Sequence, residues 1–284
     1  MNYVTFITSH NSPNECKTLD VLKSLNFNTS YYIVIDDEDT QISRYREIYG
    51  NNLLIFNKLK YIEYTDTILT PKSHCSAVYA KNFIEDFCKE NNVEAFIILD
   101  DDLKSLRFRY LEDEHLKSKK VIDVNKVFSC YVDYMIDCNI DGLCFGIHSM
   151  YMGKELLPNS KRFMSNIYFR NGKRKMEWTS TIYDDFNSCI CLSNHSYIFL
   201  MLPFVQMEFE PQYFQLQNMR SNKFREGGLV ELYDNYDSFN RAFISVIINP
   251  SGSLTYKNKL VYMMYTVSNK TFPKIISSKY KNIK

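Results

Sequence analysis

The chain has 284 residues, of which 45% are hydrophobic and 15% aromatic. A chain of this length and composition can bury a sizeable core, which excludes a wholly disordered protein. The formal net charge is +1, so the overall charge indicates neither a nucleic-acid nor a membrane partner. No apolar run approaches the roughly 20 residues that a membrane-spanning helix needs, so no membrane partner is expected.

The eight cysteines predict neither a disulfide framework nor a zinc site. Cys189 and Cys191 form the only close pair in the sequence, and no second pair with zinc-like spacing accompanies them. Most cysteines lie in apolar or periodic segments such as FSCYVDYMIDC, as buried thiols do. The opening stretch MNYVTFITSH lacks the basic region and the apolar length of a secretory leader. We therefore expect a cytoplasmic protein with reduced cysteines.

Residues 1–100 alternate between short apolar strands and helices. Strands are expected at 3–8, 31–39, 53–56 and 95–100, and helices at 16–25, 40–50 and 75–90. The helix at 40–50 ends at Gly50, and the helix at 75–90 carries its apolar residues on one face. Near-continuous apolar strands that alternate with helices are typical of a parallel sheet covered on both faces. The sequence therefore predicts an α/β fold with a Rossmann-like, mostly parallel central sheet flanked by helices.

The second half of the chain is less regular, and a mixed C-terminal half is expected there. A helix is predicted at 124–136, and strands at 141–148, 196–206 and 241–250. No internal repeat, linker or low-complexity segment separates the two halves. One continuous domain over residues 1–284 is therefore favoured.

Two of the predicted strands end in acidic residues, Asp36 and Asp37 in one and Asp100, Asp101 and Asp102 in the other. Ligands of parallel sheets bind outside the carboxyl ends of the strands, so both clusters should converge on one edge. Because alternate residues of a strand point the same way, Asp100 and Asp102 should face one pocket and Asp101 the opposite side. Such a D-x-D pair suits Mg²⁺ or Mn²⁺ shared with substrate phosphates. The alternative is a solvated acidic turn that caps a helix.

Basic residues gather in two segments of the second half. The stretch KRFMSNIYFRNGKRK (161–175) has six basic residues and no acid, and the segment 269–284 has five lysines and no acid. Such runs can follow DNA phosphates, with aromatic residues stacking on a base, although a solvated basic loop is the usual alternative. The candidates for nucleic-acid contact are Arg162, Arg170, Lys173, Arg174, Lys175 and Trp178.

Taken in order, the motifs resemble those of the phage-encoded TET-associated glycosyltransferases. The resemblance runs from residue 3 to about residue 235 and rests on IVIDDEDTQISRYREIYG, TDT, VYAKNFIEDFCKE, FIILDDDLKSLRFRY, IYDDFNSCICLSNHSYIFLMLPFVQ and GGLVELY. It implies a single domain with the GT-A nucleotide-sugar fold. It also implies transfer of a sugar from a nucleotide sugar, expected to be a UDP-sugar, onto a hydroxymethylated pyrimidine of DNA.

The resemblance also implies roles for individual residues. Asp100 and Asp102 would bind the metal, Mn²⁺ or Mg²⁺, together with the sugar nucleotide. The other donor-binding residues would be Asp36, Asp37, Gln41, Arg44, Lys81 and Asp101. Lys81 stands where the family more usually has Arg, and a snorkelling lysine is the alternative at that position. Residues 1–110 would be the nucleotide-sugar half and 111–284 the acceptor half.

Asp184 and Asp185 fall where such enzymes place a general base, and Asp185 is the expected base, with Asp184 as the near alternative. One base opposite the leaving group predicts inversion at the anomeric carbon, and retention stays open as the alternative. The alternative is that both acids only begin a helix. Three other functions stay open: a glycosyltransferase with a protein, glycan or small-molecule acceptor, a metal-dependent nuclease or phosphotransferase, and a non-catalytic nucleotide-binding module. No obligate protein partner is expected.

Overall fold

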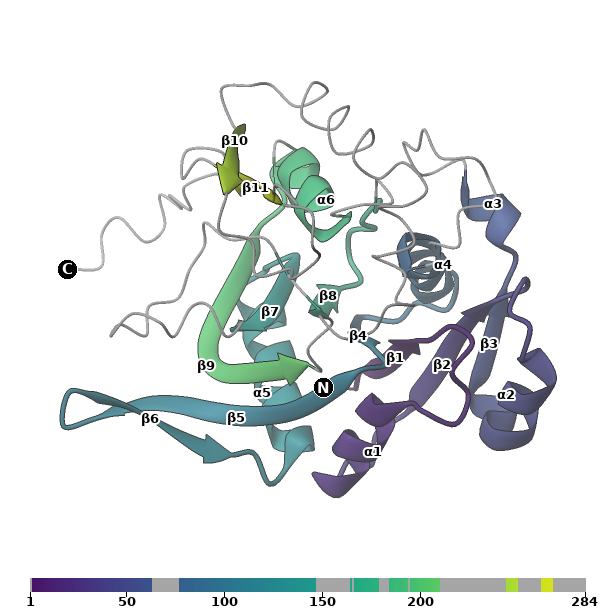
Figure 1. Ribbon diagram of the computed structural model, residues 1–284, viewed down its shortest axis with the longest axis horizontal. Coiled ribbons are helices and arrows are strands. Elements are labelled where there is room, and N and C mark those ends of the chain that lie inside the picture. Colours follow the sequence, from purple (N-terminus) through teal and green to yellow (C-terminus); the bar gives the residue numbers. More distant parts are fainter. Residues whose placement is uncertain are drawn as a thin grey trace, which may run out of the picture.

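The computed structural model describes residues 2–62, 77–146, 164, 166–178, 184–193 and 195–209, together with the backbone of 244–249 and 262–267. Within these residues, nine strands form one sheet (Figure 1). In spatial order the strands are β3 (Leu53–Phe56), β2 (Tyr31–Asp36), β1 (Val4–Thr8), β4 (Ala95–Asp100), β8 (Ile167–Asn171), β7 (Gly142–Gly146), β9 (Phe199–Phe209), β5 (Leu103–Glu112) and β6 (His115–Lys120). The helices are α1 (Lys17–Ser24), α2 (Ile42–Tyr49), α3 (Lys58–Ile62), α4 (Ala77–Glu90), α5 (Val124–Asp137) and α6 (Asp184–Ser193), and a 3₁₀ turn covers Gly50–Asn52.

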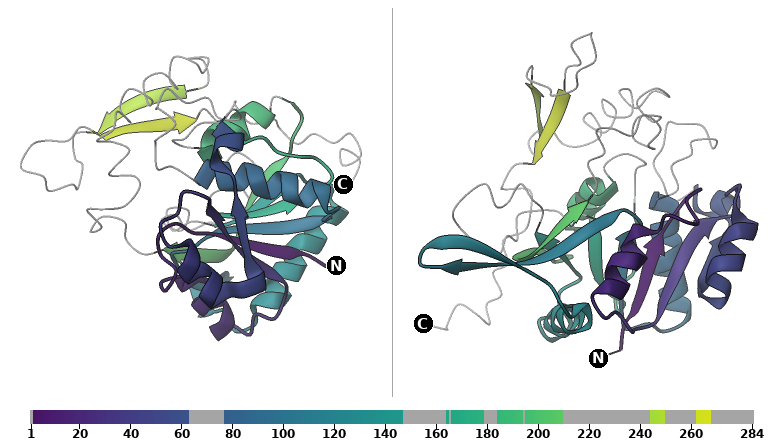
Figure 2. Two further views of the ribbon diagram at one scale, coloured as in Figure 1. Left: turned by 90° about the vertical axis from the view of Figure 1, so that its right-hand side faces the viewer. Right: turned by 60° about the horizontal axis from the view of Figure 1, so that its bottom comes forward.

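The parallel part of the sheet forms as the sequence predicts. β1 pairs in parallel with β2 and with β4, and β2 pairs in parallel with β3. The central residues of β1, β2 and β4 are buried because helices cover both faces of the sheet, whereas β3 at the sheet edge is mostly half-buried. α1 and α5 pack against one face, and α4 packs against the other (Figure 2, left). Gly50 follows the last residue of α2 with a φ of +52°, which only glycine adopts at little cost.

The sheet as a whole is mixed, which corrects the expectation of a mostly parallel sheet. In the described part of the chain, four neighbouring strand pairs are parallel and four are antiparallel. The direction changes at β8, which lies antiparallel between β4 and β7. The sequence predicts no strand at β8, because residues 161–175 are interpreted as a basic run that follows DNA phosphates or, alternatively, forms a solvated loop. β8 is instead a fully buried strand, because Glu85 on α4 binds the guanidinium of Arg170.

A second unpredicted feature is the hairpin of β5 and β6, which follows the last aspartate of the 100–102 cluster directly. Its turn residues Asp113 and Glu114 have φ values of +50° and +61°, the backbone signature of a tight hairpin turn. The strands are rich in Lys and Arg, so their apolar alternation is weak in the sequence.

The predicted elements of the second half are confirmed where the structure describes them. α5, β7, β9 and β10 (Ile244–Asn249) match the predicted helix and strands, and β10 pairs with β11 (Tyr262–Val267) in a separate two-stranded sheet. The six cysteines described in full are free. No helix in the described part of the chain is long and apolar enough to cross a membrane.

Candidate functional site

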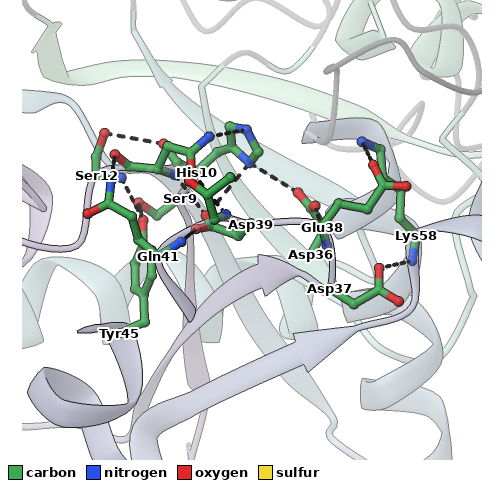
Figure 3. A network of polar contacts seen from close by, with 12 residues as sticks. Ser9, His10, Ser12, Asp36, Asp37, Glu38, Asp39, Gln41, Tyr45 and Lys58 are labelled. Atoms are coloured by element: carbon green, nitrogen blue, oxygen red, sulfur yellow. Dashed lines mark hydrogen bonds and ion pairs between the residues drawn. The ribbon is translucent and has the colours of Figure 1, made fainter. Parts of the chain in front are cut away.

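The carboxyl ends of β1, β2 and β4 meet at one edge of the sheet, as predicted. Thr8 at the end of β1 is in register with Asp100 on one side and with Val34 on the other. The loop after β1 then contacts both acidic clusters. The Ser9 hydroxyl donates to Asp101 Oδ2 (2.6 Å). His10 Nδ1 lies 3.1 Å from Asp36 Oδ2, as Figure 3 shows. The predicted convergence of the two acidic clusters is therefore confirmed.

The residues Asp100, Asp101 and Asp102, called the aspartate triplet below, are held in place by the first turn of α1. The Thr18 hydroxyl donates to the backbone carbonyl of Asp100 (2.5 Å) and accepts from the backbone N–H of Leu103 (3.0 Å). The backbone N–H of Thr18 donates to the carbonyl of Asp101 (3.1 Å). One threonine thus fixes the backbone on both sides of the triplet.

The carboxyl groups of the triplet are partly buried next to one another, and this disfavours the ionisation of Asp100 and Asp101. Burial raises the pKa of Asp100 to about 7; Lys81 opposes this increase, whereas Asp102 and Asp184 add to it. Burial likewise raises the pKa of Asp101 to about 6, and the hydrogen bond from Ser9 opposes the increase. A divalent cation would relieve this repulsion, so the donor chemistry of the triplet fits the hard cation that the sequence implies.

Lys81 on α4 binds the start of α6 and interacts with the charge of Asp100 in the triplet. Its side chain is 3% exposed. Its ammonium donates to Asp184 Oδ2 (2.5 Å) and to the Tyr168 hydroxyl (3.1 Å), and lies 4.7 Å from the ring centroid of Trp178. Burial by itself lowers the pKa of Lys81, but Asp184, Tyr168 and the more distant Asp100 raise it well above its usual range. Lys81 is therefore a buried cation held by a carboxylate, and it does not snorkel to solvent.

The acids at the end of β2 form a closed network in the loop (Figure 3). Asp36 is fully buried and accepts from the backbone N–H of Glu38 (3.1 Å) in addition to its contact with His10. Burial by itself raises the pKa of Asp36, but the hydrogen bond and charge of His10 outweigh it and lower that pKa. The same hydrogen bond raises the pKa of His10. Burial leaves Asp36 no surface for the predicted nucleoside contact, which corrects that assignment.

Three other predicted donor-binding residues lie around this network. Asp37 accepts from the backbone N–H of Lys58 (3.0 Å) and from Asn57 Nδ2 (2.8 Å). The Gln41 side chain donates to the backbone carbonyl of Asn11 (2.7 Å). Arg44 is exposed and pairs with Glu47 (2.6 Å). Their roles toward a nucleotide stay predictions.

The residues predicted to contact nucleic acid separate into two groups. Arg170 and Trp178 are fully buried. The Arg170 guanidinium forms an ion pair with Glu85 (2.7 Å), and the backbone N–H of Trp178 donates to Asn82 Oδ1. Both residues are therefore removed from the set of DNA contacts. Lys173, Arg174 and Lys175 lie at or near the surface, with Lys175 paired to Asp86 (2.6 Å) and Arg174 stacked on the Tyr197 ring. Arg162 lies outside the described residues.

Comparison with known proteins assigns the chain to a family. A family model described as TET-Associated Glycosyltransferase matches residues 3–210. The chain belongs to the TET-associated glycosyltransferase family. It is therefore a glycosyltransferase. No curated protein matches the chain. A crystal structure of a mycobacterial protein is similar over 94% of this chain and 84% of that one, with 7% sequence identity and a TM-score of 0.44.

Several side chains that support the site of this glycosyltransferase give little signal in its sequence. Thr18, Ser9 and His10 are common polar residues whose partners lie on other strands. Tyr45 bridges the Ser9 hydroxyl (2.8 Å) and the backbone N–H of Ser12 (3.0 Å). Tyr168 belongs to β8, where the sequence predicts no strand. Tyr45 is the exception, because its position in the helix predicted at 40–50 places it on the face toward the core.

Proposed function

We propose that this enzyme transfers a sugar from a nucleotide sugar, a UDP-sugar, to the hydroxymethyl group of a modified pyrimidine in DNA. The observation that carries the proposal is the placement of the aspartate triplet beside the Lys81–Asp184 pair, at the edge where parallel sheets bind nucleotides. A single GT-A-like domain would place the donor on residues 1–110 and the acceptor on 111–284.

The proposed metal site uses Asp100 and Asp102 with Mn²⁺ or Mg²⁺. Among the described residues, no group of three or more His, Cys, Asp or Glu side chains is arranged to hold a metal ion. Nucleotide-binding sites for these cations commonly supply only one or two carboxylates and leave the other positions to substrate phosphates and water. When bound, the cation would neutralise the charge that develops on the diphosphate leaving group.

The proposed base is Asp185, in the first turn of α6 beside Asp184. In the transfer step, the acceptor hydroxyl oxygen bonds to the anomeric carbon while the bond from that carbon to the diphosphate oxygen breaks. The nucleoside diphosphate leaves with the bonding electron pair, and the hydroxyl proton passes to the carboxylate of Asp185. One carboxylate oxygen of Asp184 accepts a hydrogen bond from Lys81, which suits a positioning role for Asp184. Attack opposite the leaving group would invert the anomeric carbon.

A donor screen tests the proposal directly. Melting temperatures are measured with UDP-sugars and GDP-sugars, each with and without Mn²⁺, because a ligand that binds only the folded state raises its stability. We expect a metal-dependent increase with a UDP-sugar that disappears in Asp100→Asn and persists in the exposed control Asp137→Asn. The absence of a metal-dependent increase with every donor would reject the metal and donor assignment.

The acceptor is tested separately with the donor that binds. Sugar transfer is measured by mass spectrometry on duplexes that contain cytosine, hydroxymethylcytosine or hydroxymethyluracil. We expect transfer to a hydroxymethylated duplex and none to the unmodified one. Donor turnover that requires a protein, glycan or small-molecule acceptor would reject DNA as the acceptor while leaving the donor site intact.

A further inference from the structure

The β5–β6 hairpin, Leu103–Lys120, lies at one edge of the nine-stranded sheet. Among the described residues, β6 pairs with β5, and β5 pairs with β9, which joins the hairpin to the rest of the sheet. Figure 1 and the right-hand view of Figure 2 show the hairpin extending from the sheet beyond the helices. Beyond Phe108, the last residue of β5 that pairs with β9, the hairpin is a narrow two-stranded ribbon with two faces.

The charged side chains in the strands of this hairpin are basic except for Glu112, the last residue of β5. Residues 103–111 and 116–120 together contain six basic residues and no acid, and the other acids, Asp113 and Glu114, form the turn. The basic residues are Lys104, Arg107, Arg109, Lys117, Lys119 and Lys120. Because the whole chain has a net charge of only +1, this ribbon is a local positive feature that the overall composition conceals.

The strand register places basic residues on both faces of the ribbon. Arg107 is opposite Lys120 on one face, and Tyr110 is opposite Lys117 on the other. Lys117, Lys119 and Lys120 are exposed, and the Tyr110 side chain is 39% exposed. The Arg107 guanidinium donates to the Ser118 hydroxyl across the strands (3.1 Å), which fixes its orientation.

The ribbon also begins at the candidate site. β5 starts at Leu103, the residue after Asp102, so a molecule held along the ribbon has one end beside the aspartate triplet. The ten residues of β5 span about 33 Å at about 3.3 Å per residue. At about 3.4 Å for each base pair, this length corresponds to roughly ten base pairs.

From these observations we propose that the β5–β6 hairpin binds the DNA duplex through its phosphates and leads the target base toward the triplet. The inference rests on the DNA acceptor proposed above and names the element that binds it. A two-stranded ribbon is narrow enough for the major groove, and its charge is complementary to the phosphate backbone. Lysines also protect edge strands from pairing with other chains. Protection of an edge does not account for Arg107, because β5 is paired with both β6 and β9 at that position.

The test compares two triple variants of the full chain. One is Lys117→Gln, Lys119→Gln and Lys120→Gln, and the matched control is Lys23→Gln, Lys60→Gln and Lys89→Gln, which changes three exposed lysines outside the hairpin. Binding of a fluorescent duplex is measured by anisotropy at several salt concentrations. Each lost phosphate contact should reduce the slope of log K against log salt by about 0.9. The hairpin variant should therefore bind more weakly with a smaller slope, and the control should match the wild type.

The possible outcomes separate this inference from the proposed function. If the wild type binds DNA and the hairpin variant keeps both its affinity and its salt slope, the hairpin assignment is wrong and edge protection explains its lysines. If the wild type binds no DNA, the DNA acceptor and the hairpin role are both rejected. If both triple variants melt at the wild-type temperature, the changes in binding do not come from unfolding.

Discussion

The Lys81 ammonium lies 2.5 Å from Asp184 Oδ2, and this contact joins α4 to the first residue of α6 across 103 positions of sequence. Lys81 is 3% exposed and Asp184 is 19% exposed, so the two partners differ in their access to water. Replacing each partner separately should therefore have different effects on stability.

Removal of the carboxylate should destabilise the protein more than removal of the ammonium. Asp184→Asn leaves Lys81 as a buried cation without its counter-charge, and loss of one partner of a buried pair costs about 3 kcal/mol or more. Lys81→Met leaves Asp184, which has partial access to solvent, and should cost less. In the double variant the free energy of unfolding should exceed that of Asp184→Asn alone. Urea denaturation of the four proteins measures this cycle. Additive effects would show that the contact contributes no coupling energy.

Asp185→Asn tests the general base without removing the buried pair. We expect kcat to fall by about 10²–10⁴-fold, because general base catalysis contributes about that much, while the donor-induced increase in melting temperature is kept. Steady-state transfer assays and thermal shifts measure the two quantities. Asp137→Asn, an exposed change at the end of α5, is the matched control and should keep wild-type turnover. Undiminished turnover when both Asp184 and Asp185 are changed to Asn would contradict either residue as the base.

The sequence predicts the parallel part of the fold well because its signals are local. Apolar runs such as AFIIL and the helical spacing in 75–90 indicate β4 and α4 without knowledge of distant residues. β8 was missed because its stability depends on a partner far along the chain. Arg170 can be buried in that strand only because Glu85, 85 residues earlier, accepts from it.

The same distinction applies to the site. The aspartate triplet and its convergence with the acids after β2 follow from strand ends in a parallel sheet, a rule that needs only the order of elements. The pairing of Lys81 with Asp184 and the threonine that holds the triplet need the tertiary contacts themselves. Asp36 is the opposite case. Its place at the end of a strand predicts a ligand contact, but its side chain is fully buried and hydrogen-bonded to His10.

The stability of the metal-free protein should fall as the pH rises from about 4 to about 7. Burial raises the pKa of Asp100 to about 7 and of Asp101 to about 6 in the folded state. In this range the folded state binds more protons than the unfolded state, so the free energy of unfolding decreases with pH. Urea denaturation across this range measures the slope.

Asp100→Asn is the informative comparison for that slope. It removes one of the two carboxyl groups whose pKa is raised, so the free energy of unfolding should decrease less with pH than in the wild type. The raised pKa of His10 gives a slope of the same sign in both proteins, because the stability from the His10–Asp36 contact is lost as the pH rises. The difference between the two proteins therefore reports Asp100. An identical pH dependence would show that Asp100 ionises normally in the folded state.

Binding of Mn²⁺ should release protons and strengthen as the pH rises toward neutrality. A metal ligand must be deprotonated, and the raised pKa values of Asp100 and Asp101 leave part of the triplet protonated below about pH 7. Calorimetric titrations of Mn²⁺ with a UDP-sugar, in two buffers of different ionisation enthalpy, count the released protons. We expect proton release near pH 6 that becomes small near pH 8, and weaker Mn²⁺ binding in Asp102→Asn. Binding with unchanged affinity and no proton release across this range would place the cation on other ligands.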